Sequence, residues 1–118
     1  MNDYKISELI QKVQAFCEER EWDQFHNPKD LAIGISTEGN ELLDIFRFKS
    51  DEDMKKILAN PQKREMIVDE LADVFFFVLR FAQMNQIDLG DGLESKIKKN
   101  EMKYPVNKSK GNNIKYNE

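Results

Sequence analysis

Two short acidic stretches constrain this chain more than any other feature of its sequence. Glu38 and Glu41 stand three residues apart, and Glu70 and Asp73 repeat the same spacing. On a helix, this spacing puts both side chains of a pair on one face, one above the other. If the two helices run antiparallel, we expect all four carboxylates to face one another.

The second acidic pair lies in an unusually apolar segment, residues 67–82, which includes three consecutive phenylalanines. A helix that is apolar nearly all round is packed on several sides, so we expect Asp73 to be buried. A buried carboxylate must become protonated, find a positive partner or bind a cation. Arg80 lies two turns away, too far for an ideal pair within the helix, and a cation explains Asp73 better.

The acidic set offers oxygen ligands only. No cysteine or histidine stands beside either pair in the sequence, and an all-oxygen set suits Mg²⁺ or Mn²⁺ better than zinc. The competing interpretation is that Glu38 and Glu41 are ordinary solvated carboxylates of an amphipathic helix. We do not expect His26 to be a metal ligand, because the four carboxylates already supply enough oxygens.

Composition and charge exclude several classes of protein. With 118 residues and a net charge of −4, we expect one domain without the basic face that nucleic-acid polymers require. No apolar run is long enough to span a membrane, and the N-terminal residues show no signal peptide. The single cysteine, Cys17, fits a packing role in a reducing cytosol, so we expect a cytoplasmic protein.

Capping signals and hydrophobic periodicity predict an all-α fold of four to five helices. Asn27-Pro28 and Asn60-Pro61 are helix-start signals, because Asn caps exposed amides and Pro lacks only a hydrogen that would be unpaired. The helical domain is expected to cover residues 1–105, with 106–118 as a tail that is mobile or ordered by a partner subunit. The expected helices span about residues 4–20, 27–48, 50–59, 60–86 and 88–102.

Two further groups of side chains have both a functional and a structural interpretation. Trp22 and His26 lie in a segment without clear periodicity, where aromatic side chains often serve binding or simply close the end of a bundle. Lys96, Asn100 and Lys103 fall on one helical face that suits a phosphate group. Cations near the end of a helix also interact favourably with its dipole, which is the structural alternative.

Gly34 and Gly39 lie inside the helix expected to carry the first acidic pair. Each weakens a helix interior by about 1 kcal/mol relative to alanine. Close approach of another chain or a ligand would explain this cost. The alternative is that packing compensates for a glycine that has no special role.

Three parts of the sequence together resemble one protein family. They are the two acidic pairs with their mostly helical spacer, the segment 20–28 around Trp22, and the segment 96–105 that ends in Tyr104-Pro105. The acidic pairs resemble the signature of the MazG-like, all-α nucleoside triphosphate pyrophosphohydrolases. The flanking segments are similar to the dCTP pyrophosphatase branch, and the resemblance covers about residues 6–105.

This resemblance implies a MazG-like helical bundle that assembles into a dimer or tetramer, with neighbouring subunits completing the pocket. It implies that the four carboxylates hold Mg²⁺. Phe48 and Val13 stand where the vertebrate-type enzymes have a tryptophan and a histidine, so it does not imply a preference for cytosine. The positions that match the family's binding residues are Trp22 and Phe48 for the base, and Lys96, Asn100 and Tyr104 for phosphate or sugar.

The reaction implied by the resemblance is hydrolysis of a nucleoside triphosphate to the monophosphate and pyrophosphate, in nucleotide-pool cleaning. Glu38 and Glu41 are the candidates for the general base. Lys96 and Lys103 would stabilise the departing pyrophosphate. The candidate substrates are dCTP, dUTP and modified dNTPs, which the sequence does not separate. The rival hypothesis is a helical interaction protein whose acidic pairs are structural.

Overall fold

The computed structural model describes residues 1–113. In this part of the chain it contains six α-helices, one short 3-10 helix and no strand, which confirms the all-α class. The expected number of four to five helices was too low, because the segment expected to be a tail begins with α6 (Val106–Ser109). The last five residues of that segment, 114–118, lie outside the described part. None of the described helices is long and apolar enough to span a membrane.

The chain divides into two compact units between α4 and α5, inside the segment predicted to be a single domain. The first unit, residues 1–85, holds α1 (Ile6–Glu19), the 3-10 helix η1 (Trp22–Gln24), α2 (Pro28–Phe46), α3 (Asp51–Ala59) and α4 (Pro61–Met84). The second unit begins at Gln86 and holds α5 (Leu89–Lys103) and α6.

Asparagine caps begin the two helices that carry the acidic pairs. The side-chain oxygen of Asn27 accepts a hydrogen bond from the backbone N–H of Asp30 at 2.8 Å. The side chain of Asn60 accepts one from the N–H of Lys63 at 3.0 Å. Each cap satisfies an amide that has no partner within the helix, and each is followed by proline, as the sequence predicted.

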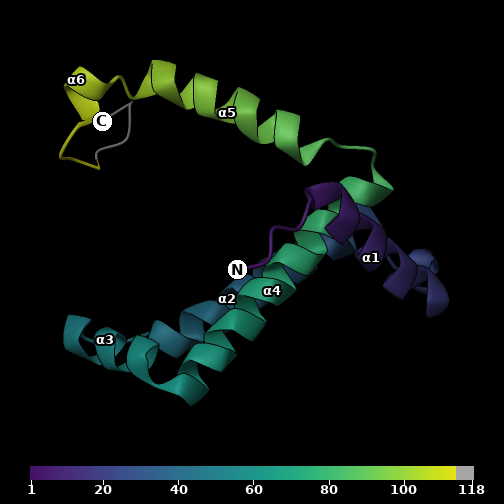
Figure 1. Ribbon diagram of the computed structural model, residues 1–118, viewed down its shortest axis with the longest axis horizontal. Helices are drawn as coiled ribbons and strands as arrows, with labels where there is room; N and C mark the ends of the chain where they lie inside the picture. Colours follow the sequence, from purple (N-terminus) through teal and green to yellow (C-terminus); the bar gives the residue numbers. More distant parts are fainter. Residues whose placement is uncertain (114–118) are drawn as a thin grey trace. The chain divides into compact units, whose positions relative to one another are not determined.

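The first unit is organised around α2 and α4, which lie side by side and have the most extensive packing in the chain (Figure 1). The short helix α3 connects them, so α2 and α4 run in opposite directions. Helix α1 packs against the C-terminal half of α4, where the rings of Phe16 and Phe76 meet edge to face. Helix α3 packs near the N-terminal end of α4 (Figure 1).

The buried core of the first unit is formed by α1, α2 and α4. The thiol of Cys17 is fully buried, which confirms the packing role expected for it. The other buried side chains are Leu31, Ile67, Leu79 and Ala82, together with the charged Arg80.

One expectation about α4 was wrong. Asp73 is exposed rather than buried. Three apolar residues of the same helix, here called the α4 stripe, are also about half exposed: Val68, Leu71 and Phe75, at 56, 52 and 43%. Residues 76–84 of α4 are all buried or half-buried, so the exposed apolar residues are confined to the part of the helix that precedes them.

Gly34 allows α2 to approach α4 closely. A β-carbon at this position would lie 2.8 Å from Cδ1 and Cε1 of Phe77, closer than non-bonded carbon atoms normally come. The phenyl ring on α4 therefore fills the space that a side chain would need, so the close approach at Gly34 is made by a helix of the same chain. A β-carbon at Gly39 would meet nothing within 4 Å, so close packing does not explain that glycine.

Alanine substitutions at these two glycines are expected to have opposite effects on stability. Gly34→Ala should lower the free energy of unfolding by about 1–3 kcal/mol, because the packed ring of Phe77 must move. Gly39→Ala should raise it by about 1 kcal/mol, because alanine is the better helix former and has open space there. Urea denaturation followed by circular dichroism measures both values. Equal effects at the two positions would contradict the close packing described for Gly34.

Candidate functional site

Three of the four predicted carboxylates converge. One oxygen each from Glu38, Glu41 and Glu70 lies within 4.8 Å of the other two. Glu38 and Glu41 come from α2 and Glu70 from α4, as the antiparallel arrangement predicted. We call these three residues the glutamate cluster. Asp73, one turn further along α4, is not within this distance, although its negative charge still acts on Glu38.

Two oxygens of the glutamate cluster lack a hydrogen-bond partner. Oε2 of Glu38 and Oε2 of Glu70 are shielded from solvent, and no described residue donates a hydrogen bond to either. Polar atoms that are shielded in this way normally have a partner, and leaving one without a partner costs free energy. A cation placed among these oxygens would supply what they lack.

The glutamate cluster takes up protons more readily than isolated carboxylates do. Burial, hydrogen bonding to Glu41 and the negative charges of Glu41, Asp73 and Glu70 raise the pKa of Glu38 to about 7. Burial, followed by the hydrogen bonding and charge of Glu41, raises the pKa of Glu70. Without a cation, the cluster therefore tends to hold a proton near neutral pH.

The donor set fits a hard divalent cation. The cluster consists of carboxylates, without histidine or cysteine. Mg²⁺ and Mn²⁺ prefer oxygen ligands of this kind, whereas zinc prefers nitrogen and sulfur. Glu38, Glu41 and Glu70 are therefore the residues that would hold such an ion, and Asp73, whose charge acts on Glu38 and Glu70, is a further carboxylate.

A pocket of about 530 Å³ borders the cluster at Glu38 and is also lined by Asp73. We call it the aromatic pocket. The ring centre of Phe16 lies 5.6 Å from that of Trp22 and 5.9 Å from that of Phe76, both edge to face. Such a wall suits a flat, apolar group such as a nucleobase. The other lining residues are Lys12, Val13 and Phe77.

A second pocket, of about 670 Å³, borders the cluster at Glu41 and Glu70 and lies among α2, α3 and α4. We call it the lysine pocket, because Lys49, Lys56 and Lys63 belong to its wall. The sequence did not reveal these lysines as a group, although they recur every seven residues, because they come from three separate elements. The other lining residues are Asp44, Ile45, Asp53, Ile57 and Met66.

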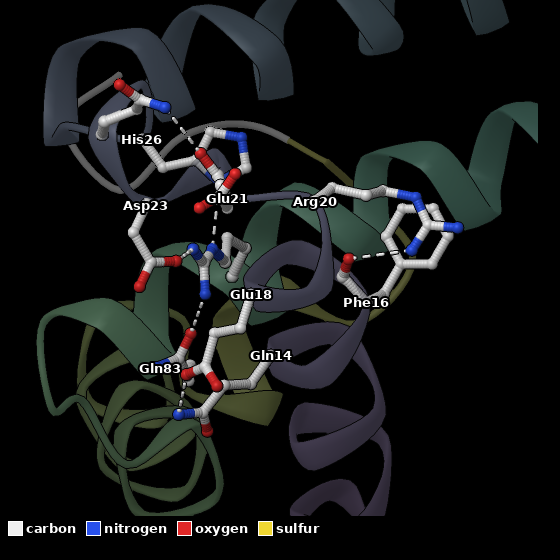
Figure 2. Close-up of polar contacts among 10 residues, drawn as sticks. Gln14, Phe16, Glu18, Arg20, Glu21, Asp23, His26 and Gln83 are labelled. Atoms are coloured by element: carbon white, nitrogen blue, oxygen red, sulfur yellow. Dashed lines mark hydrogen bonds and ion pairs between the residues drawn. The ribbon is translucent and has the colours of Figure 1, made fainter.

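The buried side chain of Arg80 fastens η1 to α4. Its Nε donates a hydrogen bond to Nδ1 of His26 at 3.0 Å, and its Nη1 donates one to Oε1 of Gln83 at 2.6 Å. Its Nη2 forms an ion pair with Asp23. Figure 2 shows Asp23, His26 and Gln83 arranged around the guanidinium. Arg80 is therefore a partner of Asp23 and does not neutralise Asp73.

These contacts also hold Trp22 at the edge of the aromatic pocket. Trp22 directly precedes Asp23, and its ring centre lies 5.9 Å from that of His26. Burial, and then the positive charge of Arg80, lower the pKa of His26, so the ring stays neutral and accepts the hydrogen bond from Arg80. His26 is not among the converging residues, and Trp22 lines the aromatic pocket.

Phe48 does not line the aromatic pocket of its own chain. Its side chain is 92% exposed and its ring centre lies 5.1 Å from the guanidinium carbon of Arg47. Its backbone φ angle is 61°, a left-handed conformation that is unfavourable for a bulky residue. Its contact with a base stays a prediction.

The residues predicted to bind phosphate or sugar belong to the second unit. Lys96, Asn100 and Lys103 lie on α5, and Tyr104 follows its last residue. The backbone N–H of Tyr104 donates a hydrogen bond to the carbonyl of Asn100 at 2.8 Å. Their participation in one site with the glutamate cluster stays a prediction.

Comparison with known proteins identifies similar chains. The model of the MazG-like family matches residues 33–118. The chain is 34% identical over 110 residues to dCTP pyrophosphatase 1 of Rattus norvegicus, covering 92% of this chain and 65% of the relative. It is 31% identical over 112 residues to dCTP pyrophosphatase 1 of Homo sapiens, covering 94% and 66%. It thus spans slightly less than two thirds of these relatives.

The fold is similar to that of a pyrophosphatase from Archaeoglobus fulgidus DSM 4304 whose crystal structure has been solved. The TM-score is 0.80 and the sequences are 31% identical. The match covers 89% of this chain and 96% of the archaeal chain.

The raised pKa of Glu38 predicts how the stability of the metal-free protein depends on pH. The pKa of Glu38 rises from 4.5 to about 7 on folding, so its proton stabilises the fold fully below the unfolded value. This stabilisation is lost as the pH rises through about 7. In the presence of a chelator we expect a lower melting temperature at about pH 8 than at about pH 6, and a weaker difference in a Glu38→Gln variant.

Addition of Mg²⁺ at the higher pH should restore the melting temperature of the wild-type protein, because a cation replaces the proton. The Asp69→Asn variant is the matched control, since Asp69 is an exposed acid beside Glu70 but outside the cluster. A melting temperature that falls equally with pH in the wild type and in Glu38→Gln would contradict the assignment.

Proposed function

Because this chain belongs to the MazG-like family, we propose that it hydrolyses a nucleoside triphosphate to the monophosphate and pyrophosphate. The observation that carries the proposal is the glutamate cluster, in which carboxylates from two helices converge within 4.8 Å. Two of its shielded oxygens have no hydrogen-bond partner, so they are available to coordinate a cation. The names of the similar proteins, dCTP pyrophosphatase and pyrophosphatase, support the same class of reaction.

The proposed substrate is dCTP or a modified dNTP, and the proposed role is cleaning of the nucleotide pool. The name of the curated relatives supports dCTP, and the aromatic pocket supports a flat base. The same chemistry on dUTP is the alternative, because Val13 in the wall of that pocket offers no polar group to distinguish the bases. The buried single thiol of Cys17 suits the cytoplasm, which we propose as the location.

In the proposed reaction, water attacks the α-phosphorus and passes its proton to Glu38 or Glu41. The bond between the α-phosphorus and the bridging oxygen breaks, and pyrophosphate leaves with the electron pair of that bond. Mg²⁺ or Mn²⁺ held by the cluster and Asp73 would offset phosphate charge and acidify water.

The remaining proposed contacts bind and orient the substrate. The base would stack on Trp22 and Phe48, and each such contact contributes about 1–3 kcal/mol where single-stranded nucleic acids are bound. The second unit would supply the ligands for phosphate and sugar, which are Lys96, Asn100, Lys103 and Tyr104.

The reaction is tested by incubating the purified protein with each common dNTP and NTP plus Mg²⁺, and separating the products by ion-exchange chromatography. We expect monophosphate and pyrophosphate from a subset of nucleotides. Glu41→Gln and Glu70→Gln should each lower the rate by about 100-fold or more, because each removes a charged ligand from the cluster. Asp69→Asn should retain the wild-type rate.

The rival hypothesis, a helical interaction protein without catalysis, predicts a different result. It requires that no nucleotide is cleaved in the presence of Mg²⁺ or Mn²⁺. It also requires that a nucleotide added together with one of these cations leaves the melting temperature unchanged. A functional site would instead raise the melting temperature, because a ligand that binds only the folded state stabilises it.

We further propose that the chain forms a homodimer or homotetramer in which a second copy covers the α4 stripe. The stripe residues Val68, Leu71 and Phe75 recur at steps of three and four and share one helical face. Their roughly half-exposed side chains form a contiguous apolar surface on the helix that also carries Glu70 and Asp73. Burial of such a surface against another copy is favourable.

Size-exclusion chromatography with light scattering tests this assembly. We expect the wild-type protein to elute as a dimer or tetramer and Leu71→Glu to shift the equilibrium toward monomer, because a charge would be buried in the interface. Ile6→Glu, at a similarly exposed position on α1, should leave the mass unchanged. A monomeric wild-type protein at high micromolar concentration would exclude the proposed interface.

A further inference from the structure

The glutamate cluster lies between two pockets of different chemistry. On α2, Glu38 lines the aromatic pocket and Glu41 lines the lysine pocket. On α4, Asp73 lines the aromatic pocket and Glu70 lines the lysine pocket. Because α2 and α4 are antiparallel, both helices lead from the aromatic pocket through the carboxylates to the lysine pocket and α3.

The lysines of the lysine pocket have no anionic partner among residues 1–113. Lys49, Lys56 and Lys63 form no ion pair or hydrogen bond with another side chain of this part of the chain. The two aspartates of the pocket are partly engaged elsewhere. Asp44 pairs with Nη1 of Arg47 at 3.6 Å, and Asp53 accepts a hydrogen bond from the backbone N–H of Ser50 at 3.3 Å.

We propose that the lysine pocket binds the β- and γ-phosphates of the substrate, and then the pyrophosphate product, through Lys49, Lys56 and Lys63. This inference rests on the proposed function, because it takes the α-phosphate to be held at the glutamate cluster. A nucleoside triphosphate then extends in two directions from that point. The base occupies the aromatic pocket, and the terminal phosphates extend toward the ammonium groups.

The opposite orientation is unfavourable on physical grounds. In the aromatic pocket Lys12 is accompanied by seven residues that are uncharged or carry a carboxylate, so a diphosphate there would meet one ammonium group instead of three. A base in the lysine pocket would lack an aromatic partner, since its uncharged lining residues are Ile45, Ile57 and Met66. The aromatic rings of one pocket and the three lysines of the other therefore favour this direction of the substrate.

The three lysines also suit departure of the leaving group. When the bond from the α-phosphorus to the bridging oxygen breaks, the electron pair remains on the pyrophosphate and its negative charge increases. Ammonium groups on Lys49, Lys56 and Lys63 would stabilise that charge as it develops. These residues come from the link after α2, from α3 and from α4, so α3 holds one wall of the phosphate site.

The test uses the double variant Lys56→Gln/Lys63→Gln and, as matched control, Lys55→Gln, an exposed lysine of α3 outside the pocket. Isothermal titration calorimetry with inorganic pyrophosphate and Mg²⁺ measures binding directly, without turnover. We expect the double variant to bind pyrophosphate about tenfold or more weakly than the wild type, because charged hydrogen bonds are lost. Lys55→Gln should bind as the wild type does.

A second titration, with the nucleoside monophosphate dCMP, separates a local effect from a general one. The double variant should bind dCMP as the wild type does, because the monophosphate does not reach the lysine pocket. Unchanged pyrophosphate binding in the double variant, or equal weakening for dCMP and pyrophosphate, would overturn the inference. Cleavage of nucleotides by the wild type, measured in the assay above, would still support the proposed function in either case.

Discussion

Mutual repulsion among carboxylates is the constraint on which the rest of the first unit depends. Glu38, Glu41 and Glu70 converge within 4.8 Å, and like charges at such short distances repel one another. Packing between α2 and α4 must offset this cost. The close approach at Gly34 and the asparagine caps contribute to that packing. The site is therefore least stable when it is fully charged and without a cation.

The buried side chain of Arg80 holds in place the turn that carries Trp22, at the edge of the aromatic pocket. Glu21, at the start of η1, has a φ angle of 55°, an unfavourable conformation that persists only where surrounding contacts maintain it. Arg80 provides such contacts through Asp23 and His26, which follow Glu21 within the same turn region. Since Arg80 and Phe76 both belong to α4, one helix positions two sides of the pocket.

Local signals in the sequence were sufficient for the helices but not for the long-range pairings. Asn27 and Asn60 predicted helix starts because a cap and its amide lie three residues apart in the chain. Arg80 and Asp23 are 57 residues apart, and no periodicity links them. The burial of Asp73 was mispredicted because an apolar helix was assumed to find neighbours on all sides within one chain. The three pocket lysines were missed because a helix boundary separates each of them from the next.

The spacing within each acidic pair explains how one cluster serves two pockets. Three residues along a helix correspond to a rise of about 4.5 Å. One carboxylate of each pair therefore lies on the aromatic side of the cluster centre and the other on the lysine side. Glu38 and Asp73 therefore reach the aromatic side, and Glu41 and Glu70 the lysine side. Asp73 is one methylene shorter than the glutamates, which accounts for its place outside the three converging oxygens. The order of aromatic pocket, carboxylates and lysine pocket beside α2 and α4 matches the order of base, α-phosphate and terminal phosphates in a nucleotide.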